Sequence, residues 1–296
     1  MNIPFLKYKK LYYVFSGALA VGSLVCLLLF GLKFGIDFLG GSILEVDFEQ
    51  RPENPAIQDK LKDLNLGEII LQPTGEKGVI LKLKDINEET HQEILKKLGE
   101  ISNIQELRFE SIGPVIGKEL RQKTITLIII SLAALLIYIV ISFRKVAFPF
   151  SSLQFGVISI VALAFDVLIL IGVFASLGNF YNVQFSIPIV TAFLTILGYT
   201  INDKVIVFDR VRENILRTRG IDISSLVNRS LNEILFRSLS TGVCTLLVLF
   251  FIFFLGGETL KYFALTLIIG IIVGTYSSLF LASPLLVSWP KWRKRA

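Results

Sequence analysis

The stretch SIPIVTAFLTILGYTINDKVIVF, Ser186 to Phe208, is long and apolar enough to cross a bilayer, yet it contains Asp203 and Lys204. A membrane-spanning helix needs about 20 mostly apolar residues. A carboxylate within such a run costs about 2.5–3.5 kcal/mol on insertion scales, and intramembrane carboxylates usually mark ion or proton pathways. The stretch therefore predicts a transmembrane helix with Asp203 as its first candidate functional residue.

Apolar runs of similar length occur in the rest of the 296-residue chain, which is 53% hydrophobic with a mean hydropathy of +0.68. This composition is too apolar for a soluble domain and indicates an integral membrane protein. Six runs can cross a membrane: 11–32, 124–143, 151–177, 186–208, 238–255 and 260–287. The first resembles a signal peptide, but no small-residue cleavage site follows it, so we expect an uncleaved anchor.

The charges predict the orientation of these helices. Residues 33–123 contain 13 basic and 17 acidic residues, a net charge of −4, whereas the remainder contains 17 basic and 7 acidic residues, a net charge of +10. The basic clusters flank spans: Lys7/Lys9/Lys10, Arg144/Lys145, Arg210–Arg229 and Lys291/Arg293/Lys294/Arg295. The positive-inside rule predicts that both termini of this multi-pass protein are cytoplasmic, in the inner membrane. Contact of these clusters with membrane lipid is expected, and nucleic acid is not.

The polar segment 33–122 is then an extracytoplasmic domain, followed by a five-helix domain over 123–287 and a basic tail over 288–296. Its short elements alternate: strands at 43–48, 68–72, 79–84 and 104–109, and helices at 55–64 and 88–98. Thr74–Gly78 has the residues of a hairpin turn. The order βαββαβ predicts a ferredoxin-like α+β fold with helices on one face of the sheet.

Chemistry-bearing residues in this domain are sparse. His91 is the only histidine of the chain, and it lies among Glu88, Glu89 and Glu93 on a helix that we expect to be partly exposed. Cys26 and Cys244 fall within spans and predict neither a disulfide nor a metal site. With no phosphate-binding or dinucleotide motif, we expect no cofactor, no metal and no enzymatic activity.

Polar residues gather on one face of the fourth span and at the start of the fifth. Tyr199, Asp203 and Arg210 share a helix face with Thr195, and Asn202 lies beside it. Arg237 begins the antiparallel fifth span at a similar depth, so Asp203 and Arg237 are predicted to face one another as a proton-coupling pair. Asp166, Asn202, Lys204, Tyr199, Asp209 and Arg210 are possible accessory residues.

Plainer alternatives exist for these polar residues. Arg237 is either a coupling residue or a topology determinant that reaches the lipid headgroups. Asp203 and Asp166 are each either functional or structural interhelical partners. Asp209, Arg210, Arg212 and Glu213 form either a proton path or, more simply, an interfacial charge cluster. In the last span, small residues at four-residue spacing (Thr266, Gly270, Gly274, Ser278, Ala282) pack either within this chain or against a moving partner.

Several motifs resemble those of the SecD/SecF family of protein-export membrane proteins, in its SecF branch. They are GIDFLGG (Gly35–Gly41), IGPVIGKEL (Ile112–Leu120), GYTINDKVIVFDRVREN (Gly198–Asn214), LFRSLSTG (Leu235–Gly242) and the stretch Phe254–Leu286. The resemblance covers nearly the whole chain, with the motifs in the family's order.

The resemblance implies half of a twelve-span transporter of the resistance-nodulation-division superfamily. It implies pairing with SecD, association with the SecYEG channel and, functionally, with SecA and YajC. The unit would use the proton-motive force to move unfolded preprotein outward after SecA-driven insertion. The family's essential Asp and Arg correspond to Asp203 and Arg237. Gly35, Asp37, Gly40, Gly41, Gly113 and Pro114 would be the junction that passes helix motion to the extracytoplasmic domain.

Two positions depart from the family pattern. Lys204 stands where the family commonly has a small hydroxyl residue, and it either lowers the pKa of Asp203 or extends away toward the headgroups. Phe165 replaces a frequent histidine before Asp166. The competing functions are a small-molecule or lipid exporter of the same superfamily and a scaffold of the translocon that transports nothing itself.

Overall fold

The computed structural model describes residues 3–64, 66–67, 69–143, 150–217 and 222–293, which form two compact units. The helical unit comprises Met1–Lys33 and Leu127–Ala296, and the sheet domain comprises Phe34–Thr126. The basic residues Arg144, Lys145, Lys294 and Arg295, positions 218–221 of the basic loop, and position 68 of the predicted second strand lie outside the described residues.

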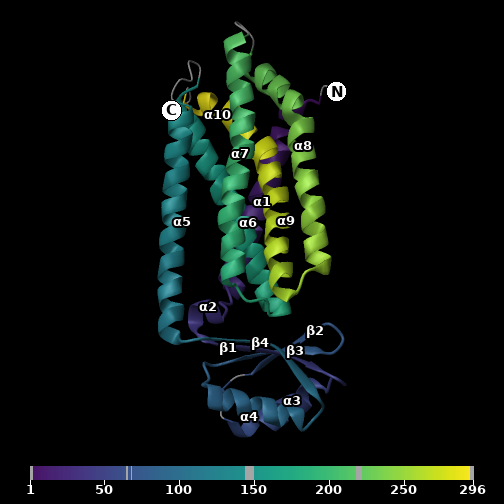
Figure 1. The fold of residues 1–296 in the computed structure, drawn as a ribbon. Helices are drawn as coiled ribbons and strands as arrows, with labels where there is room; N and C mark the ends of the chain where they lie inside the picture. Colours follow the sequence, from purple (N-terminus) through teal and green to yellow (C-terminus); the bar gives the residue numbers. More distant parts are fainter. Residues whose placement is uncertain (1–2, 65, 68, 144–149, 218–221, 294–296) are drawn as a thin grey trace. The chain divides into compact units, whose positions relative to one another are not determined.

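Six helical segments in the described part of the chain are long and apolar enough to span a membrane, as predicted, and the chain is a multi-pass membrane protein (Figure 1). They are α1 (Lys9–Phe30, preceded by a short 3₁₀ turn), α5 (Pro114–Ser142), α6 (Ser152–Tyr181), α7 (Ile187–Arg217), α8 (Ile223–Leu255) and a final segment. The final segment consists of α9 (Glu258–Tyr276), the π-helical turns η3 (Ser277–Ala282) and α10 (Ser283–Arg293).

The helices differ in how much of their surface the protein itself covers. More than half of the apolar 18-residue stretch is buried inside the protein in α6, α7 and the α9 segment. The buried share of the same stretch is 6% in α1 and in α5 and 17% in α8. α7 packs on α9, α9 on α8, and α6 on α1. The centre of the helical unit is therefore α6, α7 and α9, and the outer helices present apolar side chains to their surroundings.

Two helices extend well beyond their apolar runs. α7 continues to Arg217, nine residues past the predicted end of its span, and α8 begins at Ile223, fifteen residues before the predicted start. Asp222 caps α8 by accepting hydrogen bonds from the backbone N–H groups of Ser224 and Ser225 at 3.1 and 3.3 Å. Hydropathy detects only the apolar part of each helix, so it misses these polar turns.

The sheet domain has the predicted order of strands and helices. β1 (Gly41–Phe48), α3 (Asn54–Leu61), β2 (Ile70–Thr74), β3 (Gly78–Leu83), α4 (Glu88–Gly99) and β4 (Ile104–Ile112) follow one another, with a short helix α2 (Ile36–Leu39) before β1. The four strands form an antiparallel sheet in the order β2-β3-β1-β4. α3 and α4 lie together on one face of it (Figure 1).

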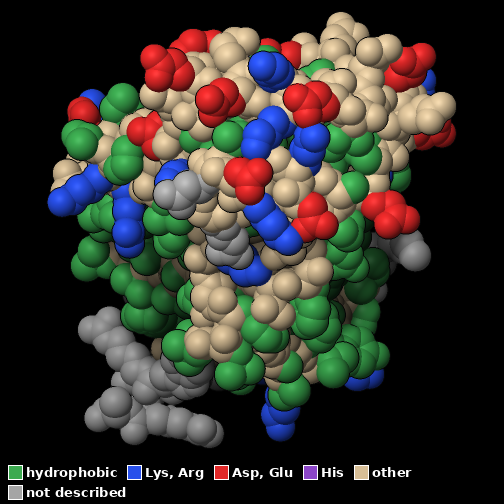
Figure 2. Space-filling model, turned by 90° about the horizontal axis from the view of Figure 1, so that it is seen from below, with side chains coloured by type: hydrophobic (Ala, Val, Ile, Leu, Met, Phe, Trp, Pro, Cys, Tyr) green, Lys and Arg blue, Asp and Glu red, His purple; other side chains and the backbone are tan. Residues whose placement is uncertain are grey.

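Alternation along β1 separates the two faces of this sheet. Leu44, Val46 and Phe48 are fully buried against α3 and α4, while the intervening residues are only partly buried. Ile57 of α3 and Ile94 of α4 complete this core with no exposed surface. Basic and acidic side chains intermingle on the face of the protein in Figure 2, as expected for a surface in water.

His91 differs from the sequence expectation. It is 4% exposed, and its ring stacks on Phe109 of β4 with centroids 3.8 Å apart. Nδ1 lies 3.2 Å from Glu88 and Nε2 lies 3.2 Å from Glu106. The sequence predicted His91 on a partly exposed helix as a solvated side chain, which was wrong because His91 shares the inward face of α4 with Ile94 and Leu98, at helical spacing.

The predicted glycine junction is a tight backbone contact within the sheet domain. Gly40 and Gly41 have φ angles of +81° and +144°, which favour glycine. A Cβ on Gly40 would lie 2.7 Å from Pro114 Cα, and a Cβ on Gly117 would lie 2.8 Å from Gly40 N. The turn before β1 is thus held directly against the first turn of α5.

Candidate functional site

Asp203 is placed by α7 in the interior of the helical unit. Its side chain is directed away from the surroundings of the protein, and the residue is 8% exposed. Ser238 of α8 and Thr275 of α9 lie beside its carboxylate. Among the described residues, its Oδ2 atom is buried with no hydrogen-bond partner. An intramembrane acid with one oxygen unsatisfied is energetically unfavourable when ionised.

Lys204 is directed toward α6, because consecutive residues of a helix point about 100° apart. Its Nζ donates a hydrogen bond of 2.7 Å to Asp166 Oδ2, and the two side chains are 0% and 1% exposed. Nζ also lies 3.5 Å from the carbonyl oxygen of Thr200. Of the two alternatives for Lys204, extension toward the headgroups is therefore not what the structure shows.

Unsatisfied polar atoms surround the two carboxylates. Asp166 Oδ1 and Thr200 Oγ1 are buried without a hydrogen-bond partner in the described part of the chain, as are Asp203 Oδ2 and Ser238 Oγ. Ser277, the first residue of the π-helical turns, lies beside Asp166. Buried polar groups in native proteins are rarely left unpaired, and each exception calls for an explanation, of which a functional role is one. We call this group (Asp166, Thr200, Asp203, Lys204, Ser238, Thr275, Ser277) the polar cluster.

Two glycines of α9 allow α9 to pack closely against α7 near the polar cluster. A side-chain atom at Gly270 would overlap Ile196, and one at Gly274 would overlap Thr200. The other members of the small-residue row, Thr266, Ser278 and Ala282, have no exposed surface. The row therefore packs within this chain, and the alternative of a surface that slides against a partner is wrong.

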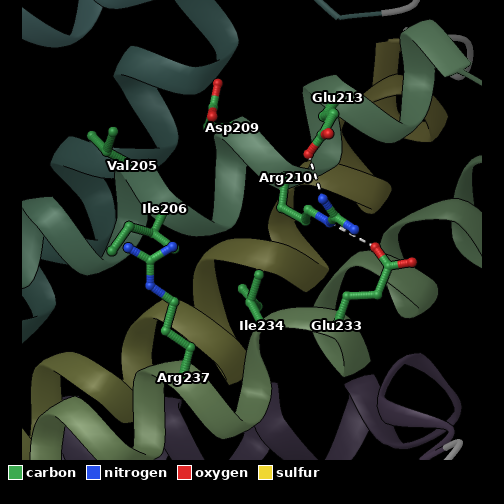
Figure 3. Close-up of a pocket in the computed structure, with 8 residues that line it drawn as sticks. All are labelled: Val205, Ile206, Asp209, Arg210, Glu213, Glu233, Ile234 and Arg237. Carbon is green, nitrogen blue, oxygen red and sulfur yellow. Dashed lines mark hydrogen bonds and ion pairs between the residues drawn. The ribbon is translucent and has the colours of Figure 1, made fainter.

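Arg237 lies on a different face of α8 from Ser238, the residue whose side chain lies beside Asp203. Its guanidinium lies in a pocket of about 490 Å³ lined by Val205, Ile206, Asp209, Arg210, Glu213, Glu233 and Ile234. Figure 3 shows this side chain beside Ile206, apart from the ion pairs of Arg210. No ion pair of Arg237 with Asp203 occurs among the described residues, and the neighbouring Ser238 lies beside Asp203 instead.

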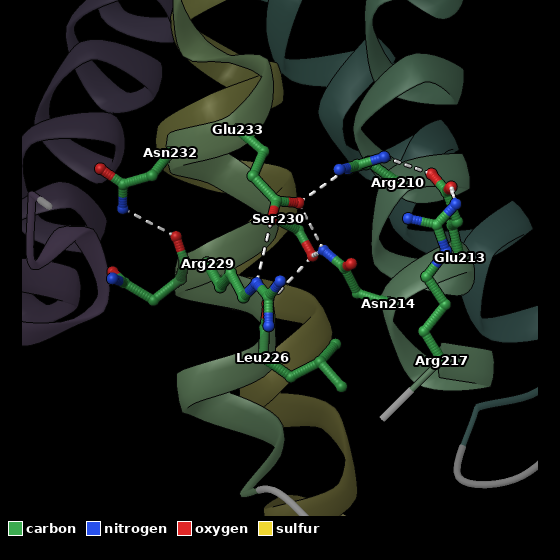
Figure 4. Close-up of polar contacts among 10 residues, drawn as sticks. Arg210, Glu213, Asn214, Arg217, Leu226, Arg229, Ser230, Asn232 and Glu233 are labelled. Atoms are coloured by element: carbon green, nitrogen blue, oxygen red, sulfur yellow. Dashed lines mark hydrogen bonds and ion pairs between the residues drawn. The ribbon is translucent and has the colours of Figure 1, made fainter. Parts of the chain in front are cut away.

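The remaining charges of α7 and α8 form a network beyond the polar cluster (Figure 4). Arg210 donates to Glu233 at 2.7 Å and to Glu213 at 2.5 Å, and Arg229 donates to Glu233 at 2.9 Å. Asn214 adds a bond to Glu233 at 2.7 Å. Arg212 lies 3.5 Å from Asp209. This arrangement matches the simpler alternative, a charge cluster that ties the ends of α7 and α8 together.

The other residues of the predicted site are dispersed. Asn202 is exposed on α7, and Tyr199 is partly buried beside Thr245 of α8. Asp209 is exposed and faces the pocket of Arg237. Gly35, Asp37, Gly40, Gly41, Gly113 and Pro114 all belong to the sheet domain. The structure thus brings Asp166, Asp203 and Lys204 together, while Arg237, Asp209 and Arg210 lie around the pocket.

Sequence reasoning did not identify several members of the polar cluster. Ser238, Thr275 and Ser277 have no distinguishing sequence signal, because hydroxyl residues are common in membrane helices, where they bond to the carbonyl four residues earlier. Thr200 carried a detectable signal, because it lies four residues before Lys204 and hence on the same face of α7.

Comparison with protein families gives two matches in sequence order. A family model described as "Protein export membrane protein SecD/SecF, C-terminal" matches residues 90–292. A model of the "SecD/SecF GG Motif" matches residues 27–50, which include Gly40 and Gly41.

Curated relatives extend this similarity over the whole chain. A protein translocase subunit SecF from Thermobaculum terrenum is 37% identical over 97% of this chain and 94% of its own length. A protein translocase subunit SecDF from Thermus thermophilus is 35% identical over 95% of this chain and 38% of its own. The crystal structure of a Thermus SecDF, described as a translocon-associated membrane protein, matches with a TM-score of 0.87 at 33% identity, over 98% of this chain and 39% of that one. By fold, motifs and full-length similarity, the chain belongs to the SecD/SecF family of protein-export membrane proteins.

Proposed function

We propose that this chain is a proton-coupled subunit of the Sec translocation machinery, which uses the proton-motive force to promote preprotein movement across the cytoplasmic membrane after SecA-driven insertion. The observation that carries the proposal is Asp203, an acid held between α7, α8 and α9 whose Oδ2 atom has no hydrogen-bond partner among the described residues. An acid in such a place binds a proton readily and, when ionised, favours a rearrangement that supplies a partner.

SecD is the expected partner. The SecDF relative joins both proteins in one chain, of which this chain spans 38%. The outer surfaces of α1, α5 and α8 are largely apolar, and the described part of this chain leaves most of them uncovered. We propose that SecD covers part of them and lipid the rest, with SecYEG and YajC as further neighbours of the assembly.

We propose that both termini are cytoplasmic and that the sheet domain is extracytoplasmic. The support comes from charge: Lys7, Lys9, Lys10 and the network at the junction of α7 and α8 all flank the ends of spans that lead to one side. In this orientation the sheet domain meets preprotein as it leaves the channel. Motion of the helices would reach it through Gly40, Gly41 and Pro114.

Arg237 completes the proposed cycle. In the structure its guanidinium lies in the pocket, one residue along α8 from the serine beside Asp203. A rotation of α8 about its axis would move Ser238 away from the ionised carboxylate of Asp203 and bring Arg237 beside it. We propose that proton release and this rotation are linked, because an ionised Asp203 attracts the cation.

The test is protein export into membrane vesicles that carry the full chain with its SecD partner, measured with and without a proton gradient. Asp203→Asn removes the titratable group with little change in shape, so we expect the gradient-dependent part of export to vanish while the complex still assembles. Glu119→Gln is the control, because it neutralises an exposed carboxylate that belongs neither to the polar cluster nor to the pocket of Arg237. If Asp203→Asn retains gradient-dependent export, the coupling residue lies elsewhere, and the alternative of a scaffold is favoured.

A further inference from the structure

The polar cluster contains two carboxylates and one ammonium group. Asp166 comes from α6, and Asp203 and Lys204 come from α7. The other polar side chains that the described part of α7, α8, α9 and η3 places near them are uncharged hydroxyls: those of Thr200, Ser238, Thr275 and Ser277, and the phenol of Tyr199, which interacts with Asp203. Arg237, the nearest charged residue along α8, lies in the pocket described above.

Charge balance in this interior restricts the protonation states. With both carboxylates ionised, Lys204 leaves one negative charge unbalanced in a buried site, which is strongly unfavourable. With one proton bound, the site is neutral. Lys204 lies 2.7 Å from Asp166, so in the neutral arrangement that fits this geometry the ammonium neutralises Asp166 and Asp203 carries the proton.

Loss of that proton creates a competition. Asp203 immediately precedes Lys204 on α7. Their side chains point about 100° apart, but the ammonium group of lysine is carried on a flexible four-carbon stem that can turn from one carboxylate toward the other. Asp166, the present partner, is on another helix and has its Oδ1 atom unsatisfied among the described residues. An ionised Asp203 therefore competes with Asp166 for the same ammonium group.

We propose that Lys204 is a shared counter-ion for Asp166 and Asp203, which limits the site to one exchangeable proton and opens the α6–α7 ion pair when that proton leaves. Lys204 is thus a positioning residue for the proton-coupling step, and the inference rests on the function proposed above. Because the pair joins α6 to α7, its opening converts a change of protonation into a loosened contact between two central helices.

The test measures the protonation of Asp203 directly, in the full chain with its partner. A hydrophobic carbodiimide reacts with protonated carboxyl groups in membranes, and mass spectrometry of the modified peptide gives the extent of labelling of Asp203 at each pH. The midpoint pH of this labelling is compared between the parent protein and three variants: Lys204→Met, Asp166→Asn and the double variant Asp166→Asn/Lys204→Met.

The double variant distinguishes a shared counter-ion from a purely structural ion pair. It removes a cation and an anion together, so neither partner of the ion pair is left buried and unpaired, which would destabilise the fold. If Lys204 is shared, we expect the midpoint pH of Asp203 labelling in the double variant to rise by about one pH unit or more, a tenfold change in proton affinity. Lys204→Met should raise the midpoint as well, and Asp166→Asn, which frees the ammonium for Asp203, should lower it. An unchanged midpoint in the double variant overturns the inference and leaves the ion pair a purely structural link.

The two proposals fail separately. If export proves indifferent to Asp203→Asn, the proposed function fails, yet the labelling midpoints still show whether Lys204 is shared. If instead Asp203→Asn abolishes gradient-dependent export and the double variant keeps the parent midpoint, the proposed function stands and the shared counter-ion is excluded.

Discussion

Gly274 of α9 lies so close to Thr200 of α7 that no side chain fits between them. The same contact brings Thr275 beside Asp203 and Ser277 beside Asp166. Close helix packing in a membrane depends on small residues, since van der Waals contact replaces the hydrophobic driving force that operates in water. The geometry of the polar cluster therefore depends on the absence of a side chain at position 274.

We predict that Gly274→Ala destabilises the helical unit by about 1–3 kcal/mol, because the new methyl group overlaps Thr200 and separates α7 from α9. The measurement is thermal unfolding of the purified full chain in detergent. Gly198→Ala on α7 is the matched control, since a Cβ there has no atom within 4 Å, and it should be neutral or slightly stabilising. Equal stability of the two variants would contradict the packing argument.

Glu233 offers a test of the charge network between α7 and α8. It accepts hydrogen bonds from Arg210, Arg229 and Asn214. We predict that Glu233→Gln weakens the link between the two helix ends by about 1–2 kcal/mol, a value reduced by partial solvent exposure. Faster amide hydrogen exchange at the end of α7 and the start of α8 would show it. Asp222→Asn, which keeps a helix-capping side chain, is the control and should leave exchange unchanged.

The sheet domain makes a prediction at His91. His91→Ala removes a buried ring that stacks on Phe109, so we expect a loss of about 1–3 kcal/mol of domain stability. Hydrogen exchange of residues 34–126 in the full chain reports it. Glu93→Ala, an exposed position on the same helix, should change stability by less than about 0.5 kcal/mol. Comparable exchange in both variants would show that His91 is dispensable.

Lys60 and Glu100 predict a pH dependence of the same domain. Their ion pair is 2.7 Å long, and the hydrogen bond and charge of Lys60 hold the pKa of Glu100 below its ordinary value. A carboxyl group whose pKa is lower in the folded state stabilises that state above its unfolded pKa, about 4.3 for Glu, and loses this effect as the pH falls through the folded pKa.

Lys60→Met should therefore be less stable than the parent at pH 7 by a small amount, and the difference should vanish at acid pH. Hydrogen exchange of α3 and α4 at several pH values measures it. A difference that persists unchanged well below pH 4 would mean that the Lys60 side chain stabilises the domain by packing and not by its charge.

The sequence predicted the elements of this protein better than the orientation of its side chains. Apolar runs located six spanning helices, and alternating short elements located the sheet domain, because both depend on local periodicity. The depth of a residue in the membrane follows from its position along the apolar run. Rotation about the helix axis does not, since it depends on crossing angles between helices, and so Ser238 rather than Arg237 lies beside Asp203.

Lys204 and His91 show a second limit. From sequence, each had a solvent-accessible alternative: extension toward the headgroups for Lys204, and an exposed helix face for His91. In the structure both are buried, because each finds a partner that is distant in sequence, Asp166 for Lys204 and Phe109 for His91. Such partners become apparent only when the helices and strands are assembled.

The π-helical turns from Ser277 to Ala282 have a consequence for the small-residue row of α9. In an α-helix, four residues advance about 40° more than one full turn, so a row at four-residue spacing drifts steadily around the helix. A π-helical turn contains more residues and reverses part of that drift. The widened turns thus offset part of the angular drift of the row, whose later members Ser278 and Ala282 are buried like Gly270 and Gly274.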